Sequence, residues 1–351
     1  MTIQEMIEAT RQGVGLFEMA DRGLLEVRGE DRVRWLDGMI SQDVAALEAS
    51  DAPSGCYALL LTNKGAIVAD LHVGRIGDVY YLESLRSEIP RIRETLDRYI
   101  IADDVVLTDL SDERPAIGLE GPGAAGLLSK ISSPETKDLE RECWMKTSIA
   151  ECEVLVGAFG FSGEAAFQIR ANAADRGAVE EAIAQAGNLG EANGLFRGSP
   201  EALGIMRVEA GIALLGAELD EDVLPPEARL EAAISTTKGC YVGQEIVARL
   251  RARGQVNHLL VGFRVEAGEL PDADVPLSAD GRVTGELTSV VSSPTAGKIA
   301  LGFVRREHAE VGTEVEFSGG RATVSALPFV EIGVELRPSV GRAVPTAAST
   351  T

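Results

Sequence analysis

Apolar positions in the first 120 residues alternate between the spacing of strands and the spacing of helices. Two apolar runs, Cys56 to Thr62 and Ala66 to Ile76, flank Asn63-Lys64-Gly65, and this arrangement predicts a β-hairpin. Other strand-like runs are 24–28, 79–82, 104–110 and 115–120. Helical patterns cover 4–12, 30–47 and 87–99. The pattern therefore predicts a mixed α and β architecture.

The pattern changes along the second half of the chain. Helices are expected at 173–186 and 200–211, on either side of a glycine-rich loop at 187–199. From His258 onward, short apolar runs are separated by Gly, Pro and Asp turns, and they predict a small antiparallel barrel. Those runs are Leu259 to Val265, Gly281 to Ser289, Lys298 to Val304 and Ala322 to Ala326.

Length and charge set limits on the class of protein. The 351 residues can bury a substantial core in two or more subdomains. We expect a cytoplasmic protein without membrane partners, because no apolar run is long enough for a bilayer and the N-terminus lacks a signal-peptide pattern. The formal net charge of −22 makes direct nucleic-acid binding unfavourable. Arg249, Arg251 and Arg253 form the sharpest basic cluster, which we interpret as a solvated helix end.

The cysteines and histidines argue against a zinc site built by one chain. Cys56, Cys143, Cys152 and Cys240 form no CxxC pair, and the three histidines are His72, His258 and His308. We therefore predict no metal site and expect unpaired thiols in a reducing compartment.

Residues 238–245, Lys-Gly-Cys-Tyr-Val-Gly-Gln-Glu, are the most informative segment. Cys240 lies between Gly239 and Gly243, and Gly239 leaves the backbone beside the sulfur free to adopt positive φ. Lys238 can favour the thiolate, which is the reactive form of cysteine. The alternative is a small buried hydrophobic residue. The polar neighbours favour a presented thiol.

This octapeptide resembles the signature of the YgfZ-type proteins, a branch of the GcvT (glycine-cleavage T-protein, aminomethyltransferase) superfamily. Met206 to Ile212 and Leu224 to Ala228 are similar to further motifs of that superfamily, and the segment from Gly285 to Gly302 resembles its C-terminal barrel. The resemblance implies an α+β fold: a cloverleaf of mixed α/β subdomains around a central folate funnel, followed by an antiparallel β-barrel. We assign 1–256 to two folate-binding subdomains, 257–334 to the barrel and 335–351 to a disordered tail.

The resemblance also implies a folate site. Asp70 matches the catalytic aspartate of the aminomethyltransferases; a carboxylate within an apolar strand needs a polar role or must point outward. The segment Gly160 to Gln168 resembles the motif whose last carboxylate holds the pterin ring. Here Gln168 stands at that position and accepts through a single oxygen, so we expect weaker pterin binding unless Glu164 substitutes. The alternative for Gln168 is a surface strand residue.

Other candidate folate-binding residues are Phe161, Arg207 and Tyr241. Arg207 and Glu209 are two apart on a predicted helix, so we expect each to find its own partner. Leu203 stands where the T-protein has an arginine for the folate tail, and this difference favours the YgfZ branch.

Two functions follow from the resemblance. The first is a tetrahydrofolate-binding accessory protein for iron–sulfur cluster assembly or repair, linked in this branch to tRNA modification. Cys240 would be its acting thiol, and its partners would be iron–sulfur proteins or assembly factors. The second is a folate-dependent aminomethyltransferase or related one-carbon transferase that uses Asp70. A scaffold protein without turnover is a third possibility. We expect Cys240, Lys238 and Asp70 to carry the chemistry.

Overall fold

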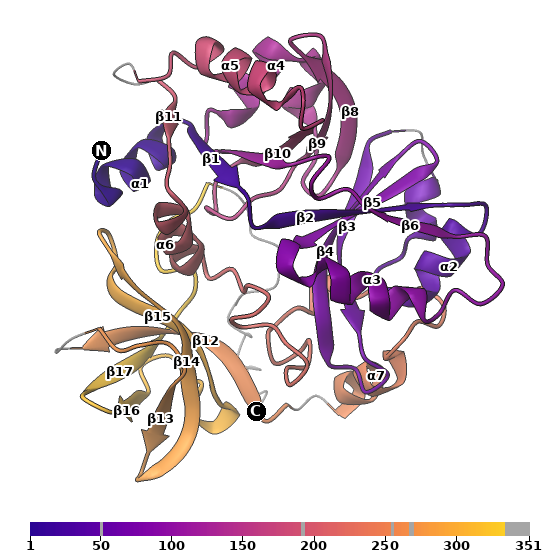
Figure 1. Cartoon of the computed structure of the whole chain (residues 1–351). Coiled ribbons are helices and arrows are strands. Elements are labelled where there is room, and N and C mark those ends of the chain that lie inside the picture. Colours follow the sequence, from indigo (N-terminus) through magenta and orange to yellow (C-terminus); the bar gives the residue numbers. More distant parts are fainter. Residues whose placement is uncertain (50–51, 191–193, 254–255, 267–269, 334–351) are drawn as a thin grey trace, which may run out of the picture.

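The computed structural model describes residues 1–49, 52–190, 194–253, 256–266 and 270–333. These residues form three lobes: two share an 11-stranded sheet and the third is a closed barrel (Figure 1). In sheet order the strands are β11 (Phe196–Arg197), β1 (Gly15–Met19), β7 (Ala116–Glu120), β10 (Ala166–Ala171), β9 (Cys152–Gly157), β8 (Trp144–Ile149), β3 (Ser54–Leu61), β4 (Ile67–Ile76), β5 (Val79–Leu85), β2 (Arg22–Arg28) and β6 (Val106–Asp109).

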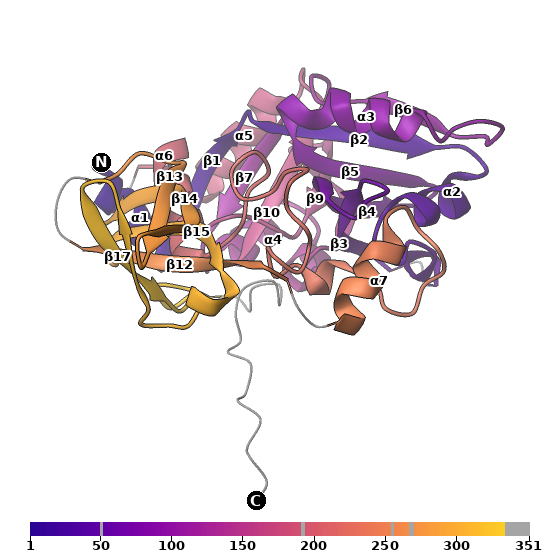
Figure 2. The same cartoon turned by 90° about the horizontal axis from the view of Figure 1, so that it is seen from below.

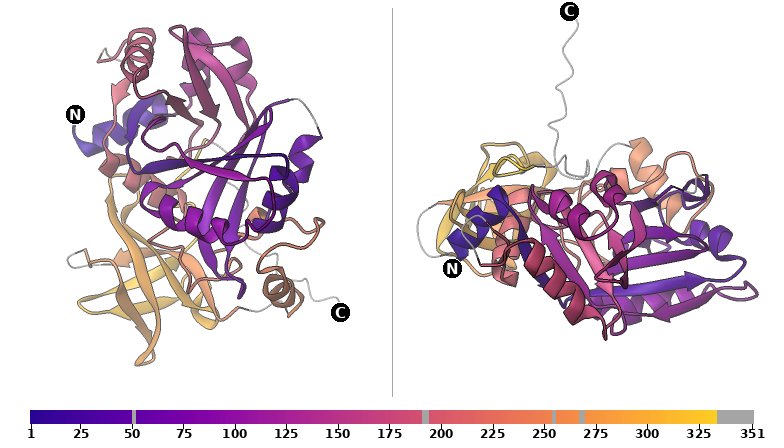
Figure 3. Two further views of the ribbon diagram at one scale, coloured as in Figure 1. Left: turned by 45° about the vertical axis from the view of Figure 1, so that its right-hand side comes forward. Right: turned by 90° about the horizontal axis from the view of Figure 1, so that it is seen from above.

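The barrel confirms the antiparallel C-terminal fold expected from the sequence. Its strands, in order around the barrel, are β12 (His258–Glu266), β15 (Gly297–Arg305), β14 (Arg282–Ser293), β13 (Val275–Ala279), β16 (Glu314–Phe317) and β17 (Gly320–Ser325). The α-helices of the described chain are α1 (Ile3–Gln12), α2 (Arg32–Met39), α3 (Ile89–Asp97), α4 (Ala124–Ile131), α5 (Arg176–Ala186), α6 (Pro200–Ala210) and α7 (Gln244–Arg253). The barrel and the pair α4 and α5 lie at opposite ends of the molecule (Figures 1 and 3).

The predicted β3–β4 hairpin is present, and Gly65 takes the positive φ of +79° that its turn requires. Leu71 and Val73 of β4 pack with Leu36 of α2 in one core cluster. Alternate residues of a strand point to opposite faces, so Asp70 and His72 face away from that helix. His72 indeed stacks on Phe159, with ring centroids 3.8 Å apart.

The second lobe is built in the same way. Ile117 of β7 and Ile169 of β10 share a core cluster with α4 and α5. Gln168 therefore faces the opposite side, where its amide lies next to Gly118 and Met19. The two halves of the sheet meet where Ser54 pairs with Trp144. Both lobes thus turn polar residues of their central strands toward the middle of the molecule.

Helix α6 lies between the sheet and the barrel (Figures 1 and 2). The Ser199 hydroxyl caps its start by accepting from the Ala202 amide at 3.1 Å, and Gly211 ends it at φ +72°. Arg207 on this helix donates to Ser289 of β14 at 2.6 Å. These contacts set the position of the barrel relative to the centre of the molecule.

One predicted helix differs from the structure, and two barrel strands were not predicted. The helix expected over 30–47 is shorter: α2 ends at Met39, and a 3-10 turn covers Ala45–Glu48. The chain leaves the helix because Ile40 becomes extended and bridges to Leu60 of β3. Strands β13 and β16 of the barrel escaped the sequence pattern because they are short. The tail predicted over 335–351 lies outside the described residues.

Candidate functional site

A cavity of about 530 Å³ lies between α6, Phe161 and the turn that joins β1 to β2. Its wall includes Met19, Asp21, Arg22, Phe161, Leu203 and Arg207. Two residues predicted from the sequence, Phe161 and Arg207, thus lie at one cavity. This volume is within the range of small-molecule sites, roughly 300–1,000 Å³.

Asp70 points into the interior. Its exposed fraction is 6%, and the Tyr57 hydroxyl donates to its Oδ2 at 3.0 Å. The other carboxylate oxygen, Oδ1, is buried and has no hydrogen-bond partner among the described residues. The outward orientation considered from the sequence is therefore wrong, because the strand turns this side away from α2. A buried, half-paired carboxylate is costly, so a bound group that donates to it would be stabilised.

Gln168 is fully buried at the centre of β10. Neither its amide nitrogen nor its amide oxygen has a partner within the described part of the chain. The surface-strand alternative is therefore wrong, since β10 lies between β7 and β9 in the sheet. An unpaired buried amide costs about 1–3 kcal/mol per group, so this side chain is suited to a ligand that offers both a donor and an acceptor.

Glu164, proposed from the sequence as a substitute for Gln168, is engaged elsewhere. Its carboxylate pairs with Arg11 of α1 at 2.8 Å, and the same arginine binds Glu209. Burial raises the pKa of the Glu164 carboxyl, although Arg11 acts in the opposite direction. We therefore see Glu164 as a residue that joins α1 to the centre of the fold.

Arg207 and Glu209 each have their own partners, as expected. Arg207 pairs with Glu218 at 2.9 Å, while Glu209 pairs with Arg11. The Leu214 amide also donates to Glu218, at 3.0 Å, which holds the loop after α6 against the cavity. The guanidinium of Arg207 is thus a structural element of the cavity wall.

A buried ion pair at the cavity was missed by sequence reasoning. Arg22 is 2% exposed and donates through Nε and Nη2 to the two oxygens of Glu83, at 2.6 and 2.9 Å. Its guanidinium carbon lies 4.8 Å from the centre of the Phe161 ring. Burial acts to lower the pKa of Arg22, but Glu83 and, less strongly, Asp70 outweigh it and raise the pKa. An arginine beside a turn gives no sequence signal for such a pairing.

The cysteine loop, residues 238–245, exposes its thiol to solvent. Cys240 is exposed, whereas Cys56, Cys143 and Cys152 are partly buried. Burial raises the pKa of the Cys56 and Cys143 thiols. Positive φ occurs at Gly243, at +84°, and not at Gly239 as the sequence suggested, because only Gly243 packs tightly, against the β3–β4 turn. The presented position of Cys240 agrees with the prediction from the motif.

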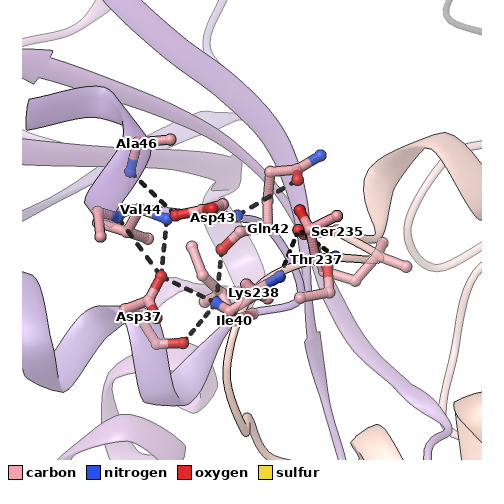
Figure 4. A network of polar contacts seen from close by, with 12 residues as sticks. Asp37, Ile40, Gln42, Asp43, Val44, Ala46, Ser235, Thr237 and Lys238 are labelled. Atoms are coloured by element: carbon pink, nitrogen blue, oxygen red, sulfur yellow. Dashed lines mark hydrogen bonds and ion pairs between the residues drawn. The ribbon is translucent and has the colours of Figure 1, made fainter. Parts of the chain in front are cut away.

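Lys238 binds the end of α2 instead of the thiol. Its ammonium lies 3.1 Å from the Asp37 carboxylate and donates to the carbonyls of Ile40 and Gln42, at 3.0 and 2.7 Å (Figure 4). A further bond goes to the Asp37 carbonyl. These acceptors use all three N–H donors, so the expectation that Lys238 favours a Cys240 thiolate is not supported. Tyr241 is buried, with its ring centre 5.4 Å from this ammonium.

Comparison with protein families identifies the class to which this fold and cavity belong. Residues 1–238 match the GCVT N-terminal domain, and residues 259–331 match the glycine cleavage T-protein C-terminal barrel domain. The chain therefore belongs to the GcvT family. This confirms the broader resemblance stated from the sequence, while the YgfZ branch remains a hypothesis.

Individual relatives agree with this assignment. The aminomethyltransferase of Bacillus velezensis is 30% identical over 333 residues, which are 93% of this chain and 88% of that protein. The aminomethyltransferase of Bacillus cytotoxicus is 29% identical over 330 residues, with the same two coverages. The glycine cleavage system aminomethyltransferase T of Bartonella henselae shares the fold, with a TM-score of 0.83 at 23% identity, covering 94% of this chain and 90% of the other.

None of the described helices combines the length and the apolar composition that a bilayer span needs. Arg249 and Arg251 are exposed on α7, in keeping with the solvated helix end inferred from the sequence.

Proposed function

We propose that this protein is a tetrahydrofolate-dependent aminomethyltransferase or a related one-carbon transferase, and that Asp70 acts on the bound folate. The observation that carries the proposal is the Asp70 carboxylate, which is 6% exposed and keeps Oδ1 without a partner among the described residues. The aminomethyltransferases of this family depend on tetrahydrofolate, in agreement with the cofactor expected from the sequence. The relatives over 93% of the chain are named aminomethyltransferases, which supports this function over the alternatives.

The residues present fit a folate. The cavity of about 530 Å³ has an apolar wall at Met19, Phe161 and Leu203 that would pack on an aromatic ring system. Gln168 would supply hydrogen bonds to polar ring edges, since both of its amide atoms lack partners in the described chain. Bound tetrahydrofolate would supply the amine nitrogens that receive the one-carbon group.

Asp70 would act through its charge and its acceptor oxygen. The Tyr57 hydroxyl holds Oδ2 at 3.0 Å and so orients the carboxylate, leaving Oδ1 to accept a hydrogen bond. A carboxylate in this position stabilises positive charge that develops on a nearby amine, and it can take up or release a proton. Burial makes such an interaction stronger than it is in water.

Titration of the purified protein with tetrahydrofolate tests the binding part of this proposal. Turnover is then measured with a lipoyl carrier protein loaded with an aminomethyl group, whose carbon would pass to tetrahydrofolate as methylene with release of ammonia and the reduced dithiol. Dimethylglycine and sarcosine are tested in parallel as methyl donors, whose methyl group would replace a proton on tetrahydrofolate. Saturable binding with turnover of one donor is expected. Binding without turnover of any donor would contradict the transferase and leave a folate-binding protein.

A second function is favoured by one observation, the exposed Cys240 in a loop that resembles the YgfZ signature. In that function the protein supports iron–sulfur cluster assembly or repair and uses the thiol as a ligand or nucleophile. A single thiol cannot hold a cluster alone, so a partner protein or a small thiol would complete the ligand set. A strain that lacks the gene is complemented with Cys240→Ser or with Asp70→Asn, and the activity of a cluster-dependent enzyme is then assayed. This separates the two functions. Loss of support on Cys240→Ser but not on Asp70→Asn would favour this second function.

A further inference from the structure

Arg22 combines three properties at the cavity. It lines the cavity, it is 2% exposed, and it lies over the Phe161 ring at 4.8 Å. Glu83 occupies one edge of the guanidinium by taking bonds from Nε and Nη2. The remaining nitrogen, Nη1, makes none of these bonds, so one edge of a fixed cation is left for a bound molecule.

The local charge balance determines which acceptor suits this edge. Glu83 also lies 3.6 Å from Arg170, which donates to the Gly23 carbonyl, and Asp70 adds a second buried carboxylate near Arg22. Two guanidinium groups thus face two buried carboxylates, and Asp21 in the cavity wall adds a further negative charge near Arg22. A carboxylate on the ligand would lose its hydration, and it would find no cation whose charge is still unpaired. A neutral carbonyl oxygen loses less hydration and still gains a charge-assisted hydrogen bond.

We propose that Arg22 is a specificity-determining residue of the cavity, and that its open edge donates to a carbonyl oxygen of a flat heterocycle packed beside Phe161. The proposal rests on the proposed function: for a tetrahydrofolate, the heterocycle is the pterin and the acceptor is its ring carbonyl at C4. Arg22 then selects molecules that carry an acceptor at this position over those that carry a donor there. Arg197 is exposed at the outer part of the same cavity and belongs to its mouth.

The test measures the dissociation constants of tetrahydrofolate and of its 4-amino-4-deoxy analogue, in which a donor replaces the carbonyl. The native protein should prefer tetrahydrofolate by roughly 10-fold to 100-fold, the range of a hydrogen bond to a charged group. In Arg22→Met/Glu83→Leu, which removes the ion pair as a unit, this preference should fall to within about 3-fold. Arg22→Lys keeps the charge but lacks the planar fork, and should retain only part of the preference.

Two controls make the outcome specific. Arg197→Ala should leave the preference unchanged, because that side chain lies at the mouth. The same measurements with the pteroate analogues, which lack the glutamate tail, should give the same preference and the same dependence on Arg22. If the effect of Arg22 disappears without the tail, Arg22 binds a tail carboxylate and the proposal is wrong.

A preference that survives in the double variant, or equal binding of the two compounds by the native protein, also overturns the proposal while leaving folate binding intact. Absence of tetrahydrofolate binding by the native protein would instead contradict the proposed function itself. Near-ultraviolet circular dichroism of each variant verifies that the native fold is present before binding is compared.

Discussion

The central strands of the sheet and the cysteine loop, residues 238–245, differ in how their buried polar groups are paired. In the sheet, Asp70 of β4 and Gln168 of β10 are buried with atoms that lack partners in the described chain, although neither lines the cavity beside Phe161. At the loop, Lys238 is buried with all its donors used, while Cys240 is exposed. Buried groups without partners lower stability and are suited to a ligand. Lys238, with every donor used, instead holds the loop in place. The unpaired groups of the sheet are therefore the ones that a ligand would stabilise, whereas the loop presents one exposed thiol.

The largest effect is expected at the Asp70 carboxylate. Asp70→Asn keeps the volume and the contact with Tyr57 but removes the charge. We expect the rate of one-carbon transfer to fall about 10²–10⁴-fold, the range of general acid–base catalysis. Steady-state turnover measures this, with Cys240→Ser as the control that should retain the native rate. The reverse order of the two variants would place the chemistry at the loop.

The buried ion pair should make the largest contribution to stability. Glu83→Leu leaves the buried Arg22 without its main partner, and breaking such a pair costs about 3–5 kcal/mol. Urea unfolding measures the loss. The double variant Arg22→Met/Glu83→Leu should recover part of it, because Arg22 no longer remains as an unpaired charge, whereas Arg170 still loses its contact with Glu83. If the single and double variants are equally unstable, the pair is not a coupled unit.

Acid should weaken the same pair. Burial acts to raise the pKa of Glu83, but Arg22 outweighs it and lowers the pKa below the ordinary value of 4.5. The ionised pair therefore contributes stability above the pKa of the unfolded chain, and this contribution is lost as the pH falls through the lower pKa of the folded state. Urea unfolding between pH 3 and pH 7 (~1 pH unit steps) should show a smaller acid loss for the double variant than for the native protein.

The two glycines of the loop provide a matched pair. An added Cβ at Gly243 would lie 2.6 Å from the Thr62 carbonyl oxygen and would require φ of +84°, whereas a Cβ at Gly239 meets open space. Gly243→Ala should therefore lower the free energy of unfolding by about 1–3 kcal/mol. Gly239→Ala should stay within about 0.5 kcal/mol. Equal losses would contradict the loop geometry.

The smallest effect on stability is expected at the thiol itself. Cys240→Ser should change the free energy of unfolding by less than about 0.5 kcal/mol, since the side chain is exposed. Alkylation with iodoacetamide at neutral pH should nonetheless modify Cys240 before Cys56 and Cys143, whose pKa values are raised by burial. Mass spectrometry of the folded protein identifies the order. Faster reaction at Cys56 would mean that the loop is closed in solution.

Much of the fold follows from local pattern. The hairpin around Asn63-Lys64-Gly65 needs a glycine at positive φ and two flanking apolar runs, and both are visible in the sequence. The barrel strands follow from short apolar runs between turns. The early end of α2 does not, because Ile40 leaves the helix to bridge to Leu60, a contact between residues 20 apart that helical periodicity cannot reveal.

The candidate site, too, was predicted only in part from the sequence. The sequence by itself determined the GcvT family and an exposed cysteine, and it selected Asp70 and Gln168 as candidate residues, because motifs are local properties. It left open whether these two side chains point inward. Only the tertiary structure decided which partners exist: Lys238 binds the end of α2, Glu164 binds Arg11, and Arg22 binds Glu83 beside Phe161. Hydrogen bonds and ion pairs depend on distances of about 3 Å between segments far apart in the chain, and those distances exist only once the lobes have packed together.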